Sequence, residues 1–340
     1  MSAIVVGAGI VGAACAYYLA HEGEAVTVLD AEFAGAGATA AGMGHIVVLD
    51  DDPLSAYSQA LLWSLSPQNI GLDRCGTLWV AETTDQLSAA SAMRGAETLD
   101  EQSLREAEPA LRPGLAGAIL VRDDGVVYQP ALTRWLLDRA REAGAVVHEH
   151  TRVDRLDALK ADVIVNAAGA AAPSLTPGLP IIPRKGHLVV TDRVPGLCHH
   201  QLVELGYVQS AHTLGDASVA FNVQPRSTGQ LLIGSSRELV GWDASINRDV
   251  LGRMLRRAVD FMPGLAEVTA LRTWTGFRPA TPDHRPFIGP WPDTPGLWIA
   301  AGHEGLGITM ALGTGRLLTD LILGRAPAID PTLYWPARVC

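Results

Sequence analysis

Residues 4–30 read IVVGAGIVGAACAYYLAHEGEAVTVLD, and this stretch decides the expected fold. A short apolar strand leads into a glycine turn, a helix and a second strand that ends in Asp30. Gly7, Gly9 and Gly12 have the spacing G-x-G-x-x-G, which permits a tight turn, close approach to a pyrophosphate and close helix–strand packing. The new helix N-terminus presents N–H groups and the positive end of its dipole to phosphates. The stretch therefore predicts a dinucleotide-binding βαβ unit.

Asp30 supports this interpretation because it follows Gly12 by 18 positions, at the end of the second strand. A carboxylate there accepts hydrogen bonds from ribose hydroxyls, and it repels a phosphate on the ribose, so NADP is not expected. The alternative is a βαβ unit that binds no ligand. The strand, turn, helix and acid occur together and in order, which favours dinucleotide binding.

The size and composition of the chain narrow the class of protein. Its 340 residues suffice for about two domains, and a net charge of −10 argues against nucleic acid or an anionic membrane as the main partner. No run reaches the roughly 18 apolar residues that span a bilayer, and no positively charged leader is present, so we expect a soluble, cytoplasmic protein. The widely spaced cysteines predict reduced thiols rather than disulfides or zinc ligands: Cys15, Cys75, Cys198 and Cys340.

Helix-like and strand-like segments alternate in two further parts of the chain, residues 130–170 and 296–324, as in a nucleotide-binding domain. A helix is also expected to begin at Thr39. Four strand-like segments between residues 186 and 235 are separated by turn residues, which is typical of antiparallel sheet. We therefore expect an α/β fold, α+β overall, with a Rossmann-type domain and an inserted, mainly antiparallel β-sheet domain. The expected segments are 1–75, 126–182 and 286–340 for the cofactor domain, and 76–125 and 183–285 for the substrate domain.

Five local matches carry a family resemblance: VVGAGIVGAACAYYLA, TAAGMGH, VNAAGAAAP, TWTGFRPATPDHRPFIG and AAGHEGLGITMALGTGRLL. Their order over nearly the whole chain resembles the superfamily of FAD-dependent amino-acid oxidases and dehydrogenases, which includes D-amino-acid oxidase and glycine oxidase. PRKGHLVVTDR (183–193) and QLVELGYVQSAH (201–212) are most similar to the flavin subunit of bacterial D-hydroxyproline dehydrogenases. The resemblance implies tightly bound, noncovalent FAD. Relatives often carry glutamate where this chain has Asp30.

The resemblance also implies which residues contact the cofactor. The glycine turn would face the pyrophosphate, Asp30 the adenosine ribose, and the backbone of Val153 the adenine. The segment around Met43 would wrap the diphosphate and the isoalloxazine edge. The last helix would stabilise reduced flavin by roughly 0.3–2 kcal/mol through its dipole. The full expected set is Gly7, Ala8, Gly9, Ile10, Val11, Gly12, Asp30, Ala31, Thr39, Ala40, Ala41, Gly42, Met43, Gly44, His45, Val153, Ala167, Ala168, Gly169, Gly302, His303, Gly305, Leu306, Gly307 and Ile308.

Arg278, within TGFRPATPD, matches the arginine that holds the substrate carboxylate in several members of the superfamily. A guanidinium suits this task because its planar fork makes two parallel, charge-assisted hydrogen bonds to a carboxylate. A surface or interdomain salt bridge is the alternative role. The implied reaction is hydride transfer from the substrate Cα–H to flavin N5, giving an imine that water hydrolyses, and no side-chain base is strictly required.

Other residues are candidates for the substrate site, each with a structural alternative. His45 could tune the flavin or contact the substrate, or it could be a hydrogen-bonded structural histidine. Glu304 could hold the substrate amine, or it could be a solvated turn residue or the partner of a nearby arginine. His187, Phe221 and Asn222 come from the sheet expected to roof the site, where plain sheet packing is the alternative. Weaker candidates are Tyr128 and Tyr207, and no His/Cys spacing supports a metal site.

The expected function is that of an FAD-dependent oxidoreductase acting on the CH–NH bond of an amino or imino acid. The leading expectation is a D-amino-acid dehydrogenase for D-proline or cis-4-hydroxy-D-proline. One alternative is a glycine or sarcosine oxidase that reduces oxygen to hydrogen peroxide. Alternatives of other classes are an NAD-dependent dehydrogenase and a flavin subunit that works only with a partner chain. Oxygen, a quinone or a partner subunit remain open as electron acceptor, and a homo- or hetero-oligomer as assembly.

Overall fold

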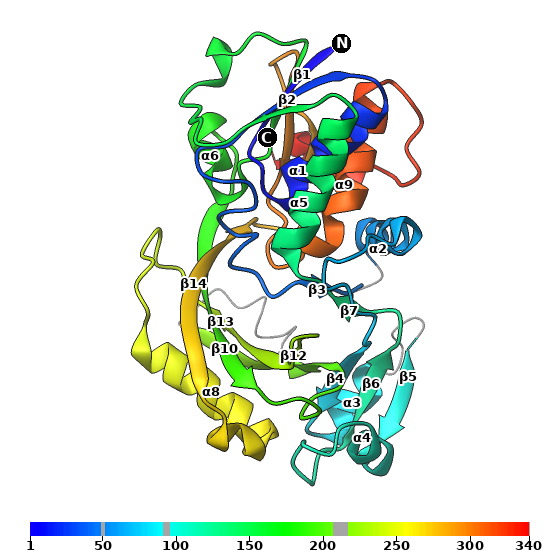
Figure 1. Cartoon of the computed structure of the whole chain (residues 1–340), viewed down its shortest axis with the longest axis vertical. Coiled ribbons are helices and arrows are strands. Elements are labelled where there is room, and N and C mark those ends of the chain that lie inside the picture. The colour runs from blue at the N-terminus through cyan, green and yellow to red at the C-terminus, as the bar shows by residue number, and fades with distance from the viewer. Residues whose placement is uncertain (49–51, 91–95, 207–216, 340) are drawn as a thin grey trace.

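The computed structural model describes residues 1–48, 52–90, 96–206 and 217–339. Two large sheets form its framework (Figure 1). The six-stranded sheet, in the upper half of the figure, is parallel except at one edge. Its order is β15 (Phe287–Pro290), β16 (Leu297–Ala301), β9 (Val163–Asn166), β1 (Ser2–Val6), β2 (Ala25–Leu29) and β8 (Val146–His148).

The eight-stranded sheet curves below the first one and is antiparallel apart from the pairing of β11 with β4 (Figure 1). Its order is β14 (Ala270–Ala280), β10 (Ile182–Arg193), β13 (Gln230–Arg237), β12 (Ser218–Pro225), β11 (Gln201–Glu204), β4 (Thr77–Ala81), β6 (Gly117–Val121) and β5 (Glu97–Asp100). A short ribbon of β3 (His45–Ile46) and β7 (Gly125–Val126) forms a third sheet.

Helices α1 (Ile10–His21), α5 (Gln129–Glu142) and α9 (Gly307–Ile322) pack with the six-stranded sheet. The strands are apolar because this packing buries them, and Val5 and Val28 are fully buried. Small residues let α1 and α9 approach closely, since a Cβ at Gly315 would lie 2.6 Å from the backbone of Ala14. This close packing fixes the N-termini of both helices near the carboxyl ends of β1 and β16.

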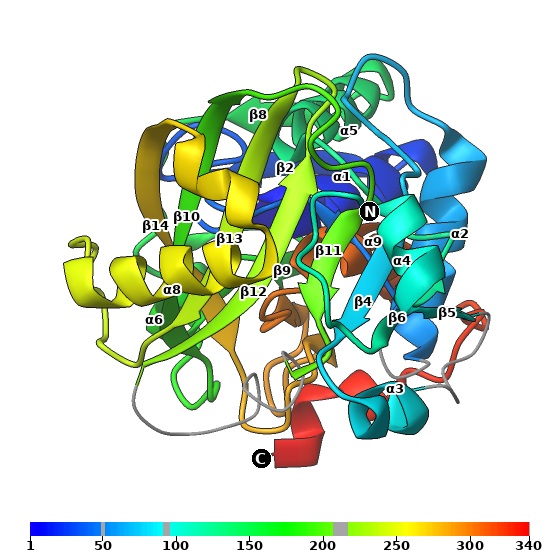
Figure 2. The ribbon, with the colours of Figure 1, turned by 90° about the horizontal axis from the view of Figure 1, so that it is seen from below.

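Helix α8 (Arg248–Phe261) covers the face of the eight-stranded sheet that points away from the six-stranded one (Figures 1 and 2). The side chain of Asn247 caps its N-terminus by accepting hydrogen bonds from the next turn. Val250, Met254, Ala258 and Phe261 recur at helical spacing and are buried against the sheet. The opposite face of this sheet is thereby left to form the roof of a cavity.

The expected mixed α/β architecture is confirmed, and several local expectations need correction. Residues 31–42 form turns, so no helix begins at Thr39. Strand β14 contains much of the TWTGFRPATPD motif, to which the sequence patterns had assigned no secondary structure. The division into five segments stays a prediction. The remaining helices are α2 (Pro53–Leu65), α3 (Thr84–Ala90), α4 (Glu101–Ala107) and α6 (Ala172–Leu175).

Three cysteines within the described residues, Cys15, Cys75 and Cys198, are free thiols. Cys340 and Tyr207 lie outside those residues. Within the described ranges, no helix combines the length and the apolar character that crossing a membrane requires.

Candidate active site

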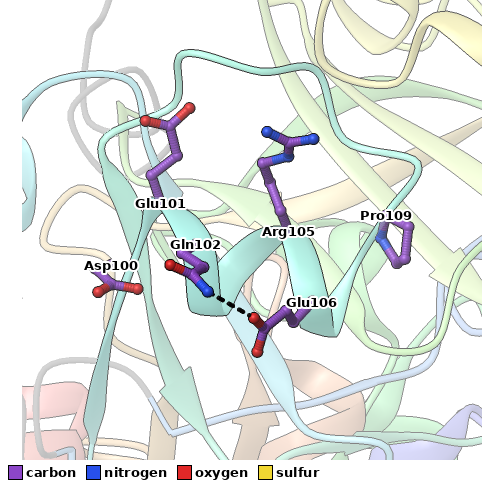
Figure 3. A pocket seen from close by; sticks show the side chains of 6 residues that line it. All are labelled: Asp100, Glu101, Gln102, Arg105, Glu106 and Pro109. Carbon is purple, nitrogen blue, oxygen red and sulfur yellow. Dashed lines mark hydrogen bonds between the residues drawn. The ribbon is translucent and has the colours of Figure 1, made fainter.

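A cavity of about 550 Å³ is lined by residues of both sheets and by the loops at their facing edges. Nineteen of the 25 expected cofactor residues line it; the six that do not are Ala8, Gly12, Ala40, Gly44, Gly302 and Leu306. A separate hollow at α4 is lined by exposed side chains of one short helix and its flanks (Figure 3), so we place no active site there: Asp100, Glu101, Gln102, Arg105, Glu106 and Pro109.

The glycine turn presents bare backbone to the cavity. Gly7 has φ +108°, and a Cβ on it would lie 2.5 Å from the carbonyl oxygen of Ala167. A Cβ on Gly12 would lie 1.9 Å from the carbonyl oxygen of Gly7, so this glycine supports the turn from behind the cavity wall. Gly9 lines the cavity, where a Cβ would meet only the hydroxyl oxygen of Thr39, at 3.2 Å. The turn therefore leaves a backbone cradle of the shape that a pyrophosphate needs.

The N-terminus of α1 supplies the hydrogen-bond donors of this cradle. The Thr39 hydroxyl accepts a 3.0 Å hydrogen bond from the Ile10 N–H, and the first helical bond is made by Ala13 to the Gly9 carbonyl oxygen at 2.8 Å. The Val11 N–H precedes that first bond and so has no acceptor within the helix. It lies where the dipole of α1 is positive, and it suits a phosphate oxygen.

Asp30 follows β2 and lines the cavity beside the glycine turn. Its Oδ2 accepts a 2.6 Å hydrogen bond from the Ala8 N–H, and its Oδ1 accepts one of 2.8 Å from the Glu32 N–H. An ionised carboxylate has about four lone-pair positions, so both oxygens can still accept hydrogen bonds from ribose hydroxyls. The aspartate side chain, which is shorter than the glutamate that relatives often carry here, is thus hydrogen-bonded to the glycine turn beside it.

The roof of the cavity begins with an apolar patch. Met43, Leu188 and Leu232 form a small buried cluster, and a Cβ at Gly234 would lie 2.8 Å from the Met43 sulfur. Met43 and Leu188 line the cavity. The roof therefore offers apolar contact to a ring system or to the apolar body of a substrate.

Arg278 lies on β14 and lines the same cavity. Its Nη1 donates a 2.9 Å hydrogen bond to the carbonyl oxygen of Ser236. A Cβ at Gly186 would lie 2.3 Å from that nitrogen, so the guanidinium occupies space that only glycine leaves open. Register places Arg184 directly opposite Arg278 on the neighbouring strand β10. These contacts fix a cationic fork on the roof of the cavity.

Glu304 lies in the turn before α9, in the left-handed conformation with φ +48°. Its carboxylate is 3.1 Å from His284 Nδ1 and 4.0 Å from Nη1 of the buried Arg184. This geometry matches the alternative in which Glu304 is the partner of a nearby arginine. The side chain also lines the cavity. A role toward the substrate amine therefore stays a prediction.

His45 lines the cavity at the start of β3, within a polar cluster. Its Nδ1 lies 2.7 Å from the side-chain oxygen of Gln201, and its Nε2 lies 3.3 Å from the side-chain nitrogen of Asn222. Burial lowers the pKa of His45 to about 4, so the ring is neutral at pH 7. The same effect lowers the pKa of His303 to about 3, where Nε2 lies 2.9 Å from the Thr314 hydroxyl. Both histidines are uncharged hydrogen-bonding groups at this site.

His187 does not reach the cavity, so its expected role as a substrate contact is wrong. Its Nδ1 lies 2.9 Å from the Ser236 hydroxyl, and its Nε2 accepts a 3.0 Å hydrogen bond from the Asn247 N–H at the start of α8. Side chains alternate along a strand, and its neighbours Gly186 and Leu188 both face the cavity. His187 therefore faces α8.

Phe221 is also placed away from the cavity, for the same reason. Its ring stacks on that of Phe261 in α8, with centroids 4.3 Å apart and planes at 3°. The next residue, Asn222, points the other way and contacts His45. Asn222 thus stands behind the cavity wall, whereas Phe221 belongs to the core under α8. Phe221 is corrected from substrate contact to core residue.

The residues expected at the cofactor but absent from the cavity wall have supporting positions. Ala8 is fully buried and donates its N–H to Asp30. A Cβ on Gly44 would lie 2.0 Å from the Val127 carbonyl oxygen, and one on Gly302 would lie 2.5 Å from the side chain of Thr281. Leu306 caps α9. The tight turns of this site therefore require glycine at positions that do not themselves line the cavity.

Several lining residues were not anticipated from the sequence. Ser235 lies on β13, Trp242 in the loop before α8, Thr275 and Phe277 on β14, and Arg152 next to Val153. Arg152 and Phe277 each lie beside a predicted contact, Val153 and Arg278, and that position could have suggested them. Tyr128 caps α5 and is largely exposed. The described part of the chain holds no group of three or more side chains suited to a metal ion.

Comparisons with known proteins agree with this geometry. The family model DAO, FAD dependent oxidoreductase, matches residues 2–321. Glycine oxidase of Pseudomonas aeruginosa is 29% identical over 98% of this chain and 98% of its own length. Hydrogen cyanide synthase subunit HcnC of the same species is 31% identical over 71% of this chain and 59% of its own. The crystal structure of glycine oxidase from Geobacillus kaustophilus has a TM-score of 0.88 and 26% identity, covering 99% of this chain and 98% of that one.

The backbone cradle, the helix N-terminus and the acid after β2 fit a flavin dinucleotide, and the match to the family covers nearly the whole chain. The chain therefore belongs to the DAO family of FAD-dependent oxidoreductases, and its cofactor is FAD.

Proposed function

We propose that this chain oxidises the CH–NH bond of a small amino or imino acid. The observation that carries the proposal is the Arg278 guanidinium, which lines the same cavity as the dinucleotide cradle. A cation fixed there anchors a carboxylate and aims the neighbouring carbon at the cofactor. FAD supplies the hydride acceptor when it is bound.

In this proposal the chain's own residues orient the substrate and balance its charge. Arg278 makes paired hydrogen bonds to the substrate carboxylate. Glu304, held by His284 and Arg184, faces the substrate amine. The neutral rings of His45 and His303 add hydrogen bonds without adding charge. The N-terminus of α9, which lines the cavity, would favour negative charge on the bound cofactor.

The finer proposal concerns the substrate and the electron acceptor. The apolar side chains of Met43 and Leu188, which line the cavity in front of Leu232, suit the ring of D-proline or cis-4-hydroxy-D-proline, which glycine lacks. These two acids remain our leading substrates, for a D-amino-acid dehydrogenase. Full-length relatives named glycine oxidase support the alternative of a glycine or sarcosine oxidase. A relative named as a subunit supports testing for a partner chain.

An anaerobic assay tests the proposal directly. The purified flavoprotein is mixed with glycine, sarcosine, D-proline, cis-4-hydroxy-D-proline and the L-enantiomers of these two prolines, and the loss of flavin absorbance is followed. We expect at least one imino acid to reduce the flavin completely. Reduction by none of them would contradict the proposal. Reoxidation by oxygen with stoichiometric peroxide indicates an oxidase, whereas reoxidation only by a quinone or an added partner indicates a dehydrogenase.

A further inference from the structure

A carboxylate lies beside the Arg278 anchor on the cavity wall. Among the described residues that line the cavity, the acids Asp30 and Glu32 lie at the glycine turn, where Asp30 accepts from the Glu32 N–H. Glu304 lies beside Arg278 instead. A Cβ on the next residue, Gly305, would be 3.9 Å from Nε of Arg278. The turn before α9 therefore brings an acid next to the guanidinium.

His284 connects Glu304 to the surface of the protein. Phe287 at the start of β15 pairs with Ala301 at the end of β16, so the loop before β15 and the turn after β16 lie side by side. In these segments Nδ1 of His284 is 3.1 Å from Oε1 of Glu304. The Glu304 side chain lines the cavity and is 18% exposed, whereas the His284 side chain does not line it and is 32% exposed. The pair therefore leads from the cavity to water.

Backbone and side-chain contacts hold the pair in this arrangement. Glu304 has φ +48° and His284 has φ +60°, a conformation that such side chains adopt rarely and mainly where the surrounding structure imposes it. The Glu304 N–H donates a 3.1 Å hydrogen bond to the Pro279 carbonyl oxygen, and the His284 N–H donates one of 3.4 Å to that of Thr281. Nη1 of the buried Arg184 is 4.0 Å from Oε2 of Glu304. The carboxylate therefore has a fixed position on the cavity wall.

A substrate amine must lose a proton before the carbon beside it can be oxidised. An alkyl amine has a pKa of about 10, so it enters the cavity as a cation at neutral pH. Its nitrogen then has no lone pair, and that lone pair is what allows a hydride to leave the adjacent carbon. Burial lowers the pKa of His45 to about 4 and that of His303 to about 3, so both rings are weak proton acceptors. Among the described residues of the cavity wall, Glu304 is the acceptor that remains beside Arg278.

We propose that Glu304 accepts the amine proton of the substrate and that His284 passes it to the solvent. The proposal rests on the oxidation of amino or imino acids proposed above. The ammonium N–H bond breaks and an O–H bond forms on Glu304, which leaves the substrate nitrogen with its lone pair. The proton then moves to Nδ1 of His284, and the imidazole releases its other N–H proton to water. Glu304 is ionised again and His284 is neutral, so the next substrate meets the same site.

The charged groups around the pair keep their charge between about pH 7 and pH 9. Arginines adjoin it and stay protonated throughout this range: Arg184, Arg278, Arg285 and Arg338. Asp283 precedes His284 and is 2.6 Å from Nε of Arg338. Burial disfavours the charge of Asp283, but its hydrogen bonds with Arg338 outweigh this and lower its pKa. A pH dependence of the reaction in this range therefore reports the substrate amine or the Glu304–His284 pair.

The pH dependence of anaerobic flavin reduction tests the role of Glu304. In the wild-type holoenzyme we expect the rate at subsaturating substrate to change by less than about threefold between pH 7 and pH 9, because the protein takes the proton. Glu304→Gln keeps the shape of the side chain but accepts no proton, so only the neutral fraction of the amine reacts. We expect unchanged flavin content and a loss of about 10²-fold at pH 7 that shrinks about tenfold for each pH unit. A Glu304→Gln profile that is as flat as the wild type would overturn the proposal.

His284→Asn tests the transfer to solvent. Asparagine tolerates the left-handed conformation, and its amide can donate to Glu304, but it cannot carry a proton. We expect the first, anaerobic turnover to stay within about twofold of the wild type, and steady-state turnover with a dye as electron acceptor to fall about tenfold and to recover on addition of imidazole. His150→Asn is the control, since it removes an exposed histidine with φ +53° from outside the cavity, and it should leave both rates unchanged. Equal slowing of the first and later turnovers in His284→Asn, or no slowing at all, would overturn the transfer.

A binding measurement needs no turnover. 2-Aminoisobutyrate has no hydrogen on its Cα and cannot be oxidised, and trimethylacetate carries a methyl group in place of its amine. We expect calorimetry to show that the wild-type holoenzyme and His284→Asn bind 2-aminoisobutyrate about tenfold more tightly, whereas Glu304→Gln binds the two acids equally. Equal binding by the wild type would overturn the role of Glu304. Failure of every amino acid to reduce the wild-type flavin would instead count against the proposed function, while this binding ratio would still decide whether Glu304 faces an amine.

Discussion

The two walls of the cavity differ in the groups that they present to a ligand. The cofactor wall uses backbone: glycines, helix N–H groups and one carboxylate tied to the turn. The roof uses side chains carried by the strands of the eight-stranded sheet, with Arg278 as their charged member. At the glycines of the cofactor wall almost no added side-chain volume can be accommodated. On the roof, a residue can contact a ligand only if it lies on the face of its strand that points into the cavity.

The largest effect should come from filling the cofactor wall. Gly12→Val would place atoms where a Cβ already lies 1.9 Å from the Gly7 carbonyl oxygen. The helix and the strand cannot both keep their positions, so we expect protein without bound flavin, or no folded protein. Absorbance near the usual flavin bands, after purification with added FAD, measures this. Gly252→Ala, a glycine of α8 with only a flexible arginine side chain nearby, is the control and should keep its flavin. A yellow Gly12→Val protein would contradict the account.

Substitutions on the side of the eight-stranded sheet that α8 covers should lower stability without changing substrate binding. Phe221→Ala removes a ring that stacks on Phe261, and it should lower the free energy of unfolding by about 3–5 kcal/mol. The KM for substrate should stay within about twofold of the wild-type value in folded protein, because Phe221 faces away from the cavity. Denaturant unfolding and steady-state kinetics measure the two quantities. A large rise in KM without loss of stability would return Phe221 to the site.

A smaller effect, with a pH signature, is expected at Asp124. This residue is fully buried, its Oδ1 accepts from Gln59 and Val48, and burial raises the pKa of its carboxyl to about 7. In the unfolded chain the carboxyl has a pKa of about 3.9. Between roughly pH 4 and 7 the Asp124 carboxyl is therefore protonated in the folded protein and ionised in the unfolded one, and above pH 7 the folded protein must bury the charge. The contribution of Asp124 to the free energy of unfolding therefore falls as the pH rises from about 4 through 7.

Asp124→Asn removes that charge. We expect the variant to gain stability over the wild type, and the gain to grow by on the order of 2–3 kcal/mol between pH 5 and pH 8. Denaturant unfolding at both values, with FAD held constant, measures it. Asp123→Asn serves as control, because Asp123 is exposed and pairs with Arg74 at the surface, where ion pairs contribute about 0–1 kcal/mol. A gain that does not change with pH would show that Asp124 is not buried with a raised pKa.

The cofactor wall could be predicted from the sequence because its signals are local. The spacing of Gly7, Gly9 and Gly12 and the acid at Asp30 belong to one βαβ unit, and each has its own physical reason. The mixed architecture followed from alternating helical and strand patterns at both ends of the chain. Thr39 was predicted to lie at the cofactor site, but at the start of a helix. It lies instead in a turn, from which its hydroxyl accepts a hydrogen bond from the Ile10 N–H at the N-terminus of α1.

The roof was harder to predict because strand faces depend on register. A shift of one residue exchanges the two faces of a strand, and no residue of HLVVTD or SVAFNV reveals which face α8 covers. His187 and Phe221 were therefore assigned to the wrong side, while Asn222 lies on the cavity side. Ser235, which lines the cavity, gave no signal at all in the sequence, because only the folding of β13 places it there.

The most direct test of the whole account is anaerobic flavin reduction in Arg278→Ala. The guanidinium is the only link in our proposal between the cofactor cradle and a substrate carboxylate. We predict that the variant keeps its full flavin content and that its reduction by the best wild-type substrate is slower by about 10²–10⁴-fold at subsaturating substrate concentration, the equivalent of losing a buried ionic contact of roughly 3–5 kcal/mol. Arg278→Lys should recover only part of the rate. Reduction of Arg278→Ala at the wild-type rate would contradict the account.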